Sequence, residues 1–553
     1  MMEILLWLKL LLLILASGIC SCRDIEVSTP QGRIIGFDTL RTRDGREIFS
    51  FTGIPYAEPP VGYLRFKEAK PLDPWSEPFN ATRSAPFCPQ IANPKNPHPQ
   101  VMGQEDCLVL NVYSPKVHKS VKLPVIIFIH GGQYYMGGSA LYGPELLLDK
   151  DVVLVTINYR LGVLGYLSTG DGAIPANIGL KDQALAIKWV HDNIENFGGN
   201  PELITVFGES SGGASAHFHL LSPMSKGLIQ RGIVMSGTAD CPWTFMSPQL
   251  AKERTIALAV LLGCPSTPTG ALLECLQAVP TQQMMEMGRR FHEWIFTPAI
   301  VWVPTYEPGC ENAFLPADPR TLESEIPLML GVTSAEGGLF APMFINSGEE
   351  YEKDLREFPR YLLPKLLYLW SEFPKDRVPE IIAQLIDFYF GKKRVDFQAP
   401  AEIISLLSDR WFMSGTVGTA EKHKGEAYLF YYDYLHSDFR GNNTSAKKRI
   451  EGTVIHGDGL FDLFPLPSKI PNRTWSEDED KVSRRTIDIW THFAINGKPD
   501  QTNLDWDPMG QTSETHKYLH ITGGELSVEE NLLADRVQFW QSMSKNQSSE
   551  RSS

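Results

Sequence analysis

Short apolar runs alternate with amphipathic segments through the first half of the chain. Residues 123–129 (LPVIIFI), 152–157 (VVLVTI) and 203–207 (LITVF) are predicted to be buried strands, because short continuous apolar runs suit the interior of a sheet. Residues 177–193, between the last two runs, carry apolar positions at helical spacing. The order strand, helix, strand predicts a parallel sheet with crossover helices, and therefore an α/β fold.

The N-terminal segment is more apolar than any other. Residues 8–16 (LKLLLLILA) are followed by two small residues, and the run is too short and too interrupted for a membrane span. This pattern is typical of a secretory signal peptide. We predict a signal peptide over 1–22 and a secreted, extracellular product. Cleavage just after the small residues, after Cys20 or after Cys22 all fit, and we place the mature start near Arg23.

Composition narrows the function classes. The chain has 553 residues, which by length alone allows three or four domains, but no repeat, low-complexity tract or linker divides it. A hydrophobic fraction of 43% excludes disorder for the bulk of the chain. The net charge of −14 provides no positive field for phosphate backbones, so nucleic acid is not expected as a partner. No later stretch is apolar enough for a transmembrane segment, and residues 546–553 form a polar tail.

Cysteines and sequons fit an oxidising compartment. Six of the eight cysteines remain after the signal peptide, and near neighbours close the shortest loops. The expected disulfides are Cys88 with Cys107 and Cys264 with Cys275, while Cys241 and Cys310 are either paired or free. The candidate glycosylation sites are Asn80, Asn442, Asn443, Asn472 and Asn546.

A Gly-x-Ser-x-Gly motif carries the candidate chemistry. Residues 208–212 (GESSG) directly follow the predicted strand 203–207 and precede a helix-compatible stretch. A strand, a sharp turn and a helix form a nucleophile elbow, which lifts the Ser210 hydroxyl to the carboxyl edge of the sheet and lets the N–H of Ser211 face an oxyanion.

A second glycine motif supplies the other oxyanion donors. Gly131 and Gly132 directly follow the predicted strand 123–129, and glycine lets backbone N–H groups approach a substrate closely. We predict that Gly131, Gly132 and Ser211 form the oxyanion hole.

These motifs belong to a longer resemblance. Residues 197–212 (FGGNPELITVFGESSG) resemble the serine signature of type-B carboxylesterases, the group that includes the cholinesterases, and 105–113 (EDCLVLNVY) resemble its second signature. The resemblance continues to residues 490–493 (WTHF), and it is strongest to secreted insect carboxylesterases: resistance esterases, venom carboxylesterases and juvenile-hormone-esterase-like proteins. It implies the α/β-hydrolase fold over 23–545: a single large domain with a large, mixed, mostly parallel central sheet flanked by helices.

The same resemblance implies the rest of a catalytic triad. Residues 333–338 (TSAEGG) match the acid loop of the family and give Glu336, and residues 452–458 (GTVIHGD) match its histidine segment and give His456. His456 would take the proton of Ser210 and later give it to the leaving alcohol, while Glu336 stays ionised and orients the imidazole. The predicted function is a secreted serine hydrolase that cleaves carboxylic esters through an acyl-enzyme on Ser210, with a small-molecule ester as its partner.

Some positions depart from the family pattern. Gln133 replaces a third glycine, Ser211 replaces the commoner alanine and Gly459 replaces a frequent acidic residue, but no required chemical group is lost.

Residues 89–106 contain no aromatic side chain, which argues against a choline ester as the substrate. Glu209 stands where juvenile hormone esterases typically have glutamine, which argues against a juvenile-hormone-type esterase. A non-catalytic adhesion or carrier member of the same fold is disfavoured because all three triad residues are present.

Two tyrosines and two histidines near the glycine motifs each have two possible roles. Tyr134 and Tyr135 either line the active-site gorge or belong to the core. His217 and His219 lack a third ligand nearby, so we expect packing residues rather than a metal site. No cofactor is predicted, and the sequence does not define the oligomeric state.

Overall fold

The computed structural model describes most of the chain. It covers residues 24–91, 100–294, 297–345, 348–395, 399–437, 452–470, 473–499, 504–509 and 515–550. The predicted signal peptide and the sequons at Asn442, Asn443 and Asn472 lie outside the described residues, as does the side chain of Asn546. Asn80, the remaining sequon, is exposed.

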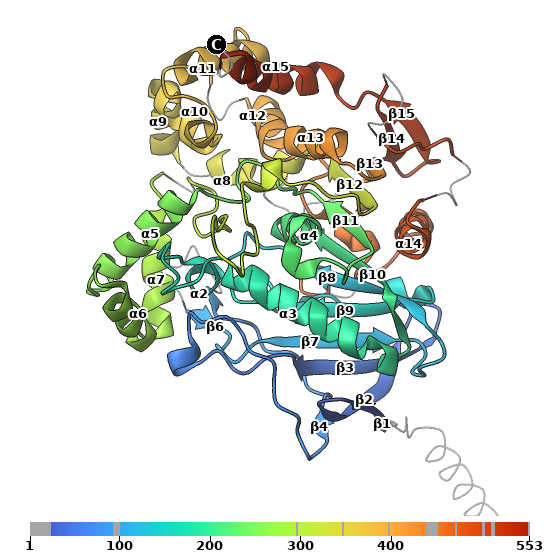
Figure 1. The fold of residues 1–553 in the computed structure, drawn as a ribbon. Coiled ribbons are helices and arrows are strands. Elements are labelled where there is room, and N and C mark those ends of the chain that lie inside the picture. The colour runs from blue at the N-terminus through green and yellow to red at the C-terminus, as the bar shows by residue number, and fades with distance from the viewer. Residues whose placement is uncertain are drawn as a thin grey trace, which may run out of the picture.

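A large mixed sheet forms the centre of the molecule (Figure 1). Its strands run in the order β1-β2-β3-β7-β9-β8-β10-β11-β12-β13-β14-β15, with β4 beside β2. Adjacent strands are parallel from β9 to β14 along this order, whereas the pairs β1–β2, β2–β3, β3–β7, β7–β9 and β14–β15 are antiparallel. The predicted fold class is therefore confirmed. The strands are β1 (Asp24–Thr29), β2 (Gly32–Arg41), β3 (Glu47–Pro55), β4 (Phe79–Asn80), β7 (Val109–Ser114), β8 (Leu123–Ile129), β9 (Val153–Ile157), β10 (Gly199–Glu209), β11 (Arg231–Met235), β12 (Leu328–Thr333), β13 (Ala427–Tyr432), β14 (Lys517–Ile521) and β15 (Ser527–Glu530), with a separate ribbon of β5 (Gln90–Ile91) and β6 (Val101–Met102).

Helices cover both faces of this sheet and extend beyond one end of it (Figure 1). They are α2 (Gly162–Tyr166), α3 (Ile178–Asn193), α4 (Ser211–Leu221), α5 (Pro248–Leu261), α6 (Thr269–Ala278), α7 (Thr281–Gly288), α8 (Ala341–Ile345), α9 (Glu349–Glu357), α10 (Pro359–Leu366), α11 (Val378–Phe390), α12 (Pro400–Ser408), a π-helix (Asp409–Met413), α13 (Ser414–Lys422), α14 (Glu477–Asn496) and α15 (Ala534–Glu550). No helix in the described ranges is both long and apolar enough to cross a membrane.

Two apolar cores lie on opposite faces of the sheet. Val125, Ile127 and Ile129 of β8 belong to one core, whereas Ile126 and Phe128 belong to the other. Successive side chains of a strand point to opposite faces, so a strand buried on both sides is apolar at every position. This explains the continuous apolar run that marked β8 in the sequence.

One predicted strand is longer than its apolar run. β10 begins at Gly199, which pairs with Leu123, and its register then shifts before Ile204. The polar and proline-containing residues 200–202 lie at this irregularity, so the apolar pattern indicated only the later part of the strand.

Both predicted disulfides are present. The Cα atoms of Cys88 and Cys107 are 5.1 Å apart, and those of Cys264 and Cys275 are 5.7 Å apart. Cys241 is buried and Cys310 is exposed, and both are free thiols within the described part of the chain.

Candidate active site

Ser210 lies in the turn between β10 and α4. Its backbone has φ 60° and ψ −128°, a conformation that non-glycine residues rarely adopt. A Cβ on Gly208 would lie 2.1 Å from the carbonyl oxygen of Gly212, and one on Gly212 would lie 2.0 Å from that of Ile129. Only glycine fits at both positions, which explains the spacing of the motif. The strand, sharp turn and helix predicted around Ser210 are all present.

Glu336 and His456 meet at the same edge of the sheet. Glu336 is fully buried at the beginning of a 3₁₀ turn after β12, and its Oε2 lies 2.6 Å from His456 Nδ1. The other carboxylate oxygen accepts hydrogen bonds from Thr333 N (2.7 Å) and Ser236 Oγ (2.5 Å). These contacts fix the carboxylate, which in turn fixes the imidazole tautomer, because an ionised carboxylate can only accept.

Ser236 was not identified from the sequence. It directly follows β11, the strand between β10 and β12, and its φ is 54°. The available signal was a polar residue directly after a buried strand, because the carboxyl ends of parallel strands share one edge.

Glu209 places a second carboxylate at the imidazole. Its Oε1 is 3.2 Å from His456 Nε2, and the described residues show no hydrogen bond between Ser210 Oγ and His456. Catalytic hydrogen bonds are often absent or long before substrate binds. Ser210 and Glu209 both lie beside Gly131. A Cβ on Gly131 would lie 3.0 Å from Ser210 Cβ and 2.9 Å from Glu209 Oε2.

Burial and nearby charges shift the pKa values of His456 and Glu209. Burial lowers the pKa of His456, but the negative charges of Glu209 and Glu336 outweigh it and raise that pKa to about 8. Burial raises the pKa of Glu209 to about 7, although the charge of His456 opposes the shift. The two groups therefore compete for a proton near neutral pH, and their titrations are coupled.

The predicted oxyanion donors are the backbone N–H groups of three residues near Ser210. The N–H groups of Gly131, Gly132 and Ser211 donate no backbone hydrogen bond within the described residues, which leaves them available to a ligand. Gly132 has φ 113°, and a Cβ there would lie 2.1 Å from Met136 O. Ser211 Oγ accepts a hydrogen bond from Tyr134 N (3.1 Å), so this hydroxyl ties the glycine loop to α4.

The backbone of the loop after Gly132 explains why glycine is common at position 133. Gln133 and Tyr134 have φ 61° and 56°, in the left-handed region that glycine enters most easily. Tyr134 is fully buried, with its ring edge-on to that of Tyr166 at 5.1 Å, and belongs to the core. Tyr135 is only partly buried.

The two histidines of α4 are packing residues. His217 Nδ1 accepts from Ala239 N (3.0 Å), and His219 is hydrogen-bonded to Ser225 (2.7 Å) and Gln183 (3.0 Å). Burial lowers the pKa of both to about 3, so both are neutral. In the described ranges, no group of three or more His, Cys, Asp or Glu is arranged to hold a metal ion.

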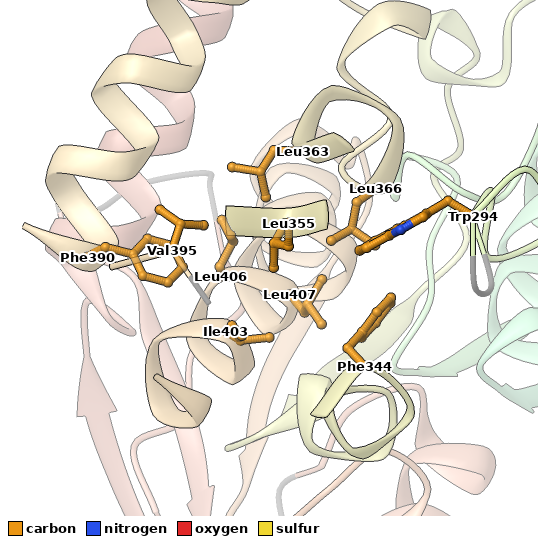
Figure 2. A pocket seen from close by; sticks show the side chains of 10 residues that line it. All are labelled: Trp294, Phe344, Leu355, Leu363, Leu366, Phe390, Val395, Ile403, Leu406 and Leu407. Atoms are coloured by element: carbon orange, nitrogen blue, oxygen red, sulfur yellow. The ribbon is translucent and has the colours of Figure 1, made fainter. Parts of the chain in front are cut away.

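An apolar cavity lies behind the acid loop. Figure 2 shows its lining, which comes from α8 to α12, from Trp294 and from Val395 between α11 and α12; the helical residues are Phe344, Leu355, Leu363, Leu366, Phe390, Ile403, Leu406 and Leu407. Leu407 packs against the loop, because its Cβ would lie 2.9 Å from a Cβ on Gly337. None of Ser210, Glu336 and His456 lines this cavity.

Comparisons with known proteins show which proteins the chain is similar to. Residues 23–540 match the model of the carboxylesterase family. The chain is 36% identical to a juvenile hormone esterase of Tribolium castaneum over 93% of each protein, and 36% identical to esterase FE4 of Myzus persicae over 91% of this chain and 90% of that one. It also superimposes with a TM-score of 0.82, at 28% identity, on the crystal structure of juvenile hormone esterase from Manduca sexta with OTFP covalently attached, covering 94% of this chain and 99% of that one.

Proposed function

Since this chain belongs to the carboxylesterase family and is a carboxylic ester hydrolase, we propose that it acts through an acyl-enzyme on Ser210. The observation that carries the proposal is the His456–Glu336 pair at the sheet edge where the strained Ser210 joins β10 to α4. A hydroxyl is a weak nucleophile, and an oriented imidazole makes it effective by taking its proton during attack.

The proposed reaction has two halves. Ser210 Oγ attacks the ester carbonyl carbon while its proton passes to His456 Nε2, and the N–H groups of Gly131, Gly132 and Ser211 hold the oxyanion. The tetrahedral intermediate then collapses, and the alcohol leaves with the proton from Nε2. Water repeats these steps on the acyl-enzyme and releases the carboxylate. For the first step, Nε2 exchanges its contact with Glu209 for one with Ser210 Oγ, while Nδ1 stays on Glu336.

A fluorophosphonate probe tests the nucleophile. We expect one adduct per chain, on the peptide that contains Ser210, and a parallel loss of p-nitrophenyl ester hydrolysis. Protein unfolded before labelling is the control, because Ser210 is activated only by the folded site. An adduct on another residue that accompanies the loss of hydrolysis would contradict the proposal.

Glu209→Gln is expected to move the pH profile of kcat/KM. His456 accepts a proton only when neutral, so activity rises with pH through its pKa of about 8. Glutamine removes the charge 3.2 Å from Nε2, which makes the imidazolium less stable. The acid limb should shift to lower pH by roughly one unit. Asp44→Asn, a change at an exposed carboxylate, is the control. An unchanged acid limb of kcat/KM in Glu209→Gln would refute the role of the Glu209 charge in raising the pKa of His456.

Juvenile-hormone-type esterase activity is the second candidate. The names of the relatives from Tribolium castaneum and Manduca sexta favour it, and Glu209 argues against it. Competition between juvenile hormone and a p-nitrophenyl ester for the purified enzyme distinguishes the two: a general esterase would be inhibited only weakly.

The proposed enzyme is secreted after removal of residues 1–22. Sequencing the N-terminus of protein collected from the culture medium tests this, and a product that retains the leader would contradict it.

A further inference from the structure

One continuous helical segment touches the proposed base and the residue next to the proposed acid. It consists of α12, the π-helix and α13. Ser408 Oγ, at the end of α12, accepts a hydrogen bond from Gly337 N (2.9 Å), next to Glu336. Four residues later, the ring of Phe412 lies 4.7 Å from that of His456. Residues four apart share a helix face, so a single face contacts both sides of the pair.

The imidazole requires more than its hydrogen bond to be held in place. When Nε2 leaves Glu209 for Ser210 Oγ in the proposed reaction, only the contact of Nδ1 with Glu336 holds the ring by a polar atom, and the ring can rotate about that contact. The rings of Phe412 and Phe340, with centroids 4.7 and 5.8 Å from that of His456, restrict this rotation. Phe412 is itself buried and packs on Trp243 (5.7 Å).

The π-helix is stabilised by contacts from other elements. π-helical turns are rare, and they occur frequently at functional sites. Trp243 Nε1 donates to the carbonyl of Trp411 (2.7 Å), and Cys241 Sγ contacts that of Phe412 (3.7 Å). Trp411 Nε1 donates to Leu366 O (3.0 Å).

The last helix of the chain anchors the π-helix. Asp409 is fully buried and accepts hydrogen bonds from Arg536 Nε of α15 and from Tyr389 OH, each 2.6 Å long. Trp540 of α15 donates to Tyr389 OH (2.8 Å), and Arg410 lies over the Trp540 ring at 5.2 Å. In Figure 1, α15 extends over the end of the molecule that holds α12 and α13.

We propose that Phe412 is a positioning residue for His456, and that the C-terminal helix maintains this position through the ion pair between Arg536 and the buried Asp409. The proposal rests on the proposed function, because it requires His456 to be the base. A displaced imidazole loses an interaction needed only in the transition state, so kcat should fall while KM changes little.

Steady-state kinetics of Phe412→Leu with a p-nitrophenyl ester tests the first part. We expect kcat to fall roughly 10- to 100-fold, since small misplacements of catalytic groups cost this much, with KM nearly unchanged. Phe412→Tyr, which keeps the ring, should recover most of kcat. Phe493→Leu is the matched control, because it removes the same volume from the other core. An equal kcat for the two leucine variants would overturn the inference.

Variants of Arg536 test the second part of the proposal, that the C-terminal helix maintains the position of Phe412. Arg536→Gln should lower kcat, Arg536→Lys should recover part of it, and the double variant Arg536→Gln/Phe412→Leu should lose less than the product of the two single effects. Arg43→Gln, which breaks an ion pair with Asp149 and Asp480, is the control. A loss of kcat in the double variant equal to the product of the two single losses would overturn the link to α15. If Phe412→Leu does not fold, Phe412→Met takes its place.

His456→Gln in the same assay separates this inference from the proposed function. Retained activity in His456→Gln would refute the role of His456 itself. An inactive His456→Gln together with a Phe412→Leu no worse than Phe493→Leu would refute only the positioning role.

Discussion

Ser210→Ala is expected to lower kcat for a p-nitrophenyl ester by about 10⁴- to 10⁶-fold, the range seen when a triad nucleophile is removed. Alanine cannot form the acyl-enzyme, while the oxyanion donors and the binding surface remain. The backbone conformation of residue 210 is equally unusual for serine and alanine, so the melting temperature should change little.

Ser225→Ala is the matched control for this measurement. Ser225 is also a buried, hydrogen-bonded serine, and its partner is His219 rather than a triad residue. Turnover by Ser210→Ala close to that of Ser225→Ala would exclude Ser210 as the nucleophile.

Glu336→Gln is expected to lower kcat by about 10⁴-fold, as the equivalent acid-to-amide change does in a serine protease triad. The carboxylate accepts three hydrogen bonds, from His456 Nδ1, Thr333 N and Ser236 Oγ. An amide accepts only through its oxygen, which the Thr333 and Ser236 donors hold, so its NH₂ group would face Nδ1. The imidazole would then carry its proton on Nε2 and could not take the proton of Ser210.

The control for this variant is Glu479→Gln. Glu479 is another buried carboxylate with several hydrogen bonds, but it caps α14 and contacts none of the triad. Circular dichroism of both variants shows whether the fold is kept. Full activity of folded Glu336→Gln would show that Glu336 does not orient the base.

Local patterns predicted the parts of the fold that depend on local chemistry. The buried strands were recognisable because both faces of β8, β9 and the regular part of β10 are covered, which demands apolar residues at every position. The turn at Ser210 was recognisable because only glycine fits at positions 208 and 212. Glu336 and His456 have weak local signals and were found through the resemblance to a family.

Contacts between distant segments were not predictable in this way. Ser236 and Phe412 reach the proposed triad through the arrangement of the strands and helices. Glu209 was visible as part of the motif at 208–212, but its contact with His456 was not. The roles of Tyr134 and Tyr135 also depended on packing: the first is enclosed by the core, and the second is only partly buried. Such contacts are set by tertiary structure, for which the periodicity of a single segment carries no information.

The distribution of the triad along the chain also has a consequence for synthesis. Ser210 follows β10, whereas His456 comes after β13, so the ribosome adds the whole intervening stretch before the base exists. At translation rates of 5–20 residues per second, this delay is on the order of 10 to 50 s. During that time, the nascent polypeptide carries the proposed nucleophile without the proposed base, so the proposed mechanism allows no ester hydrolysis before synthesis is nearly complete.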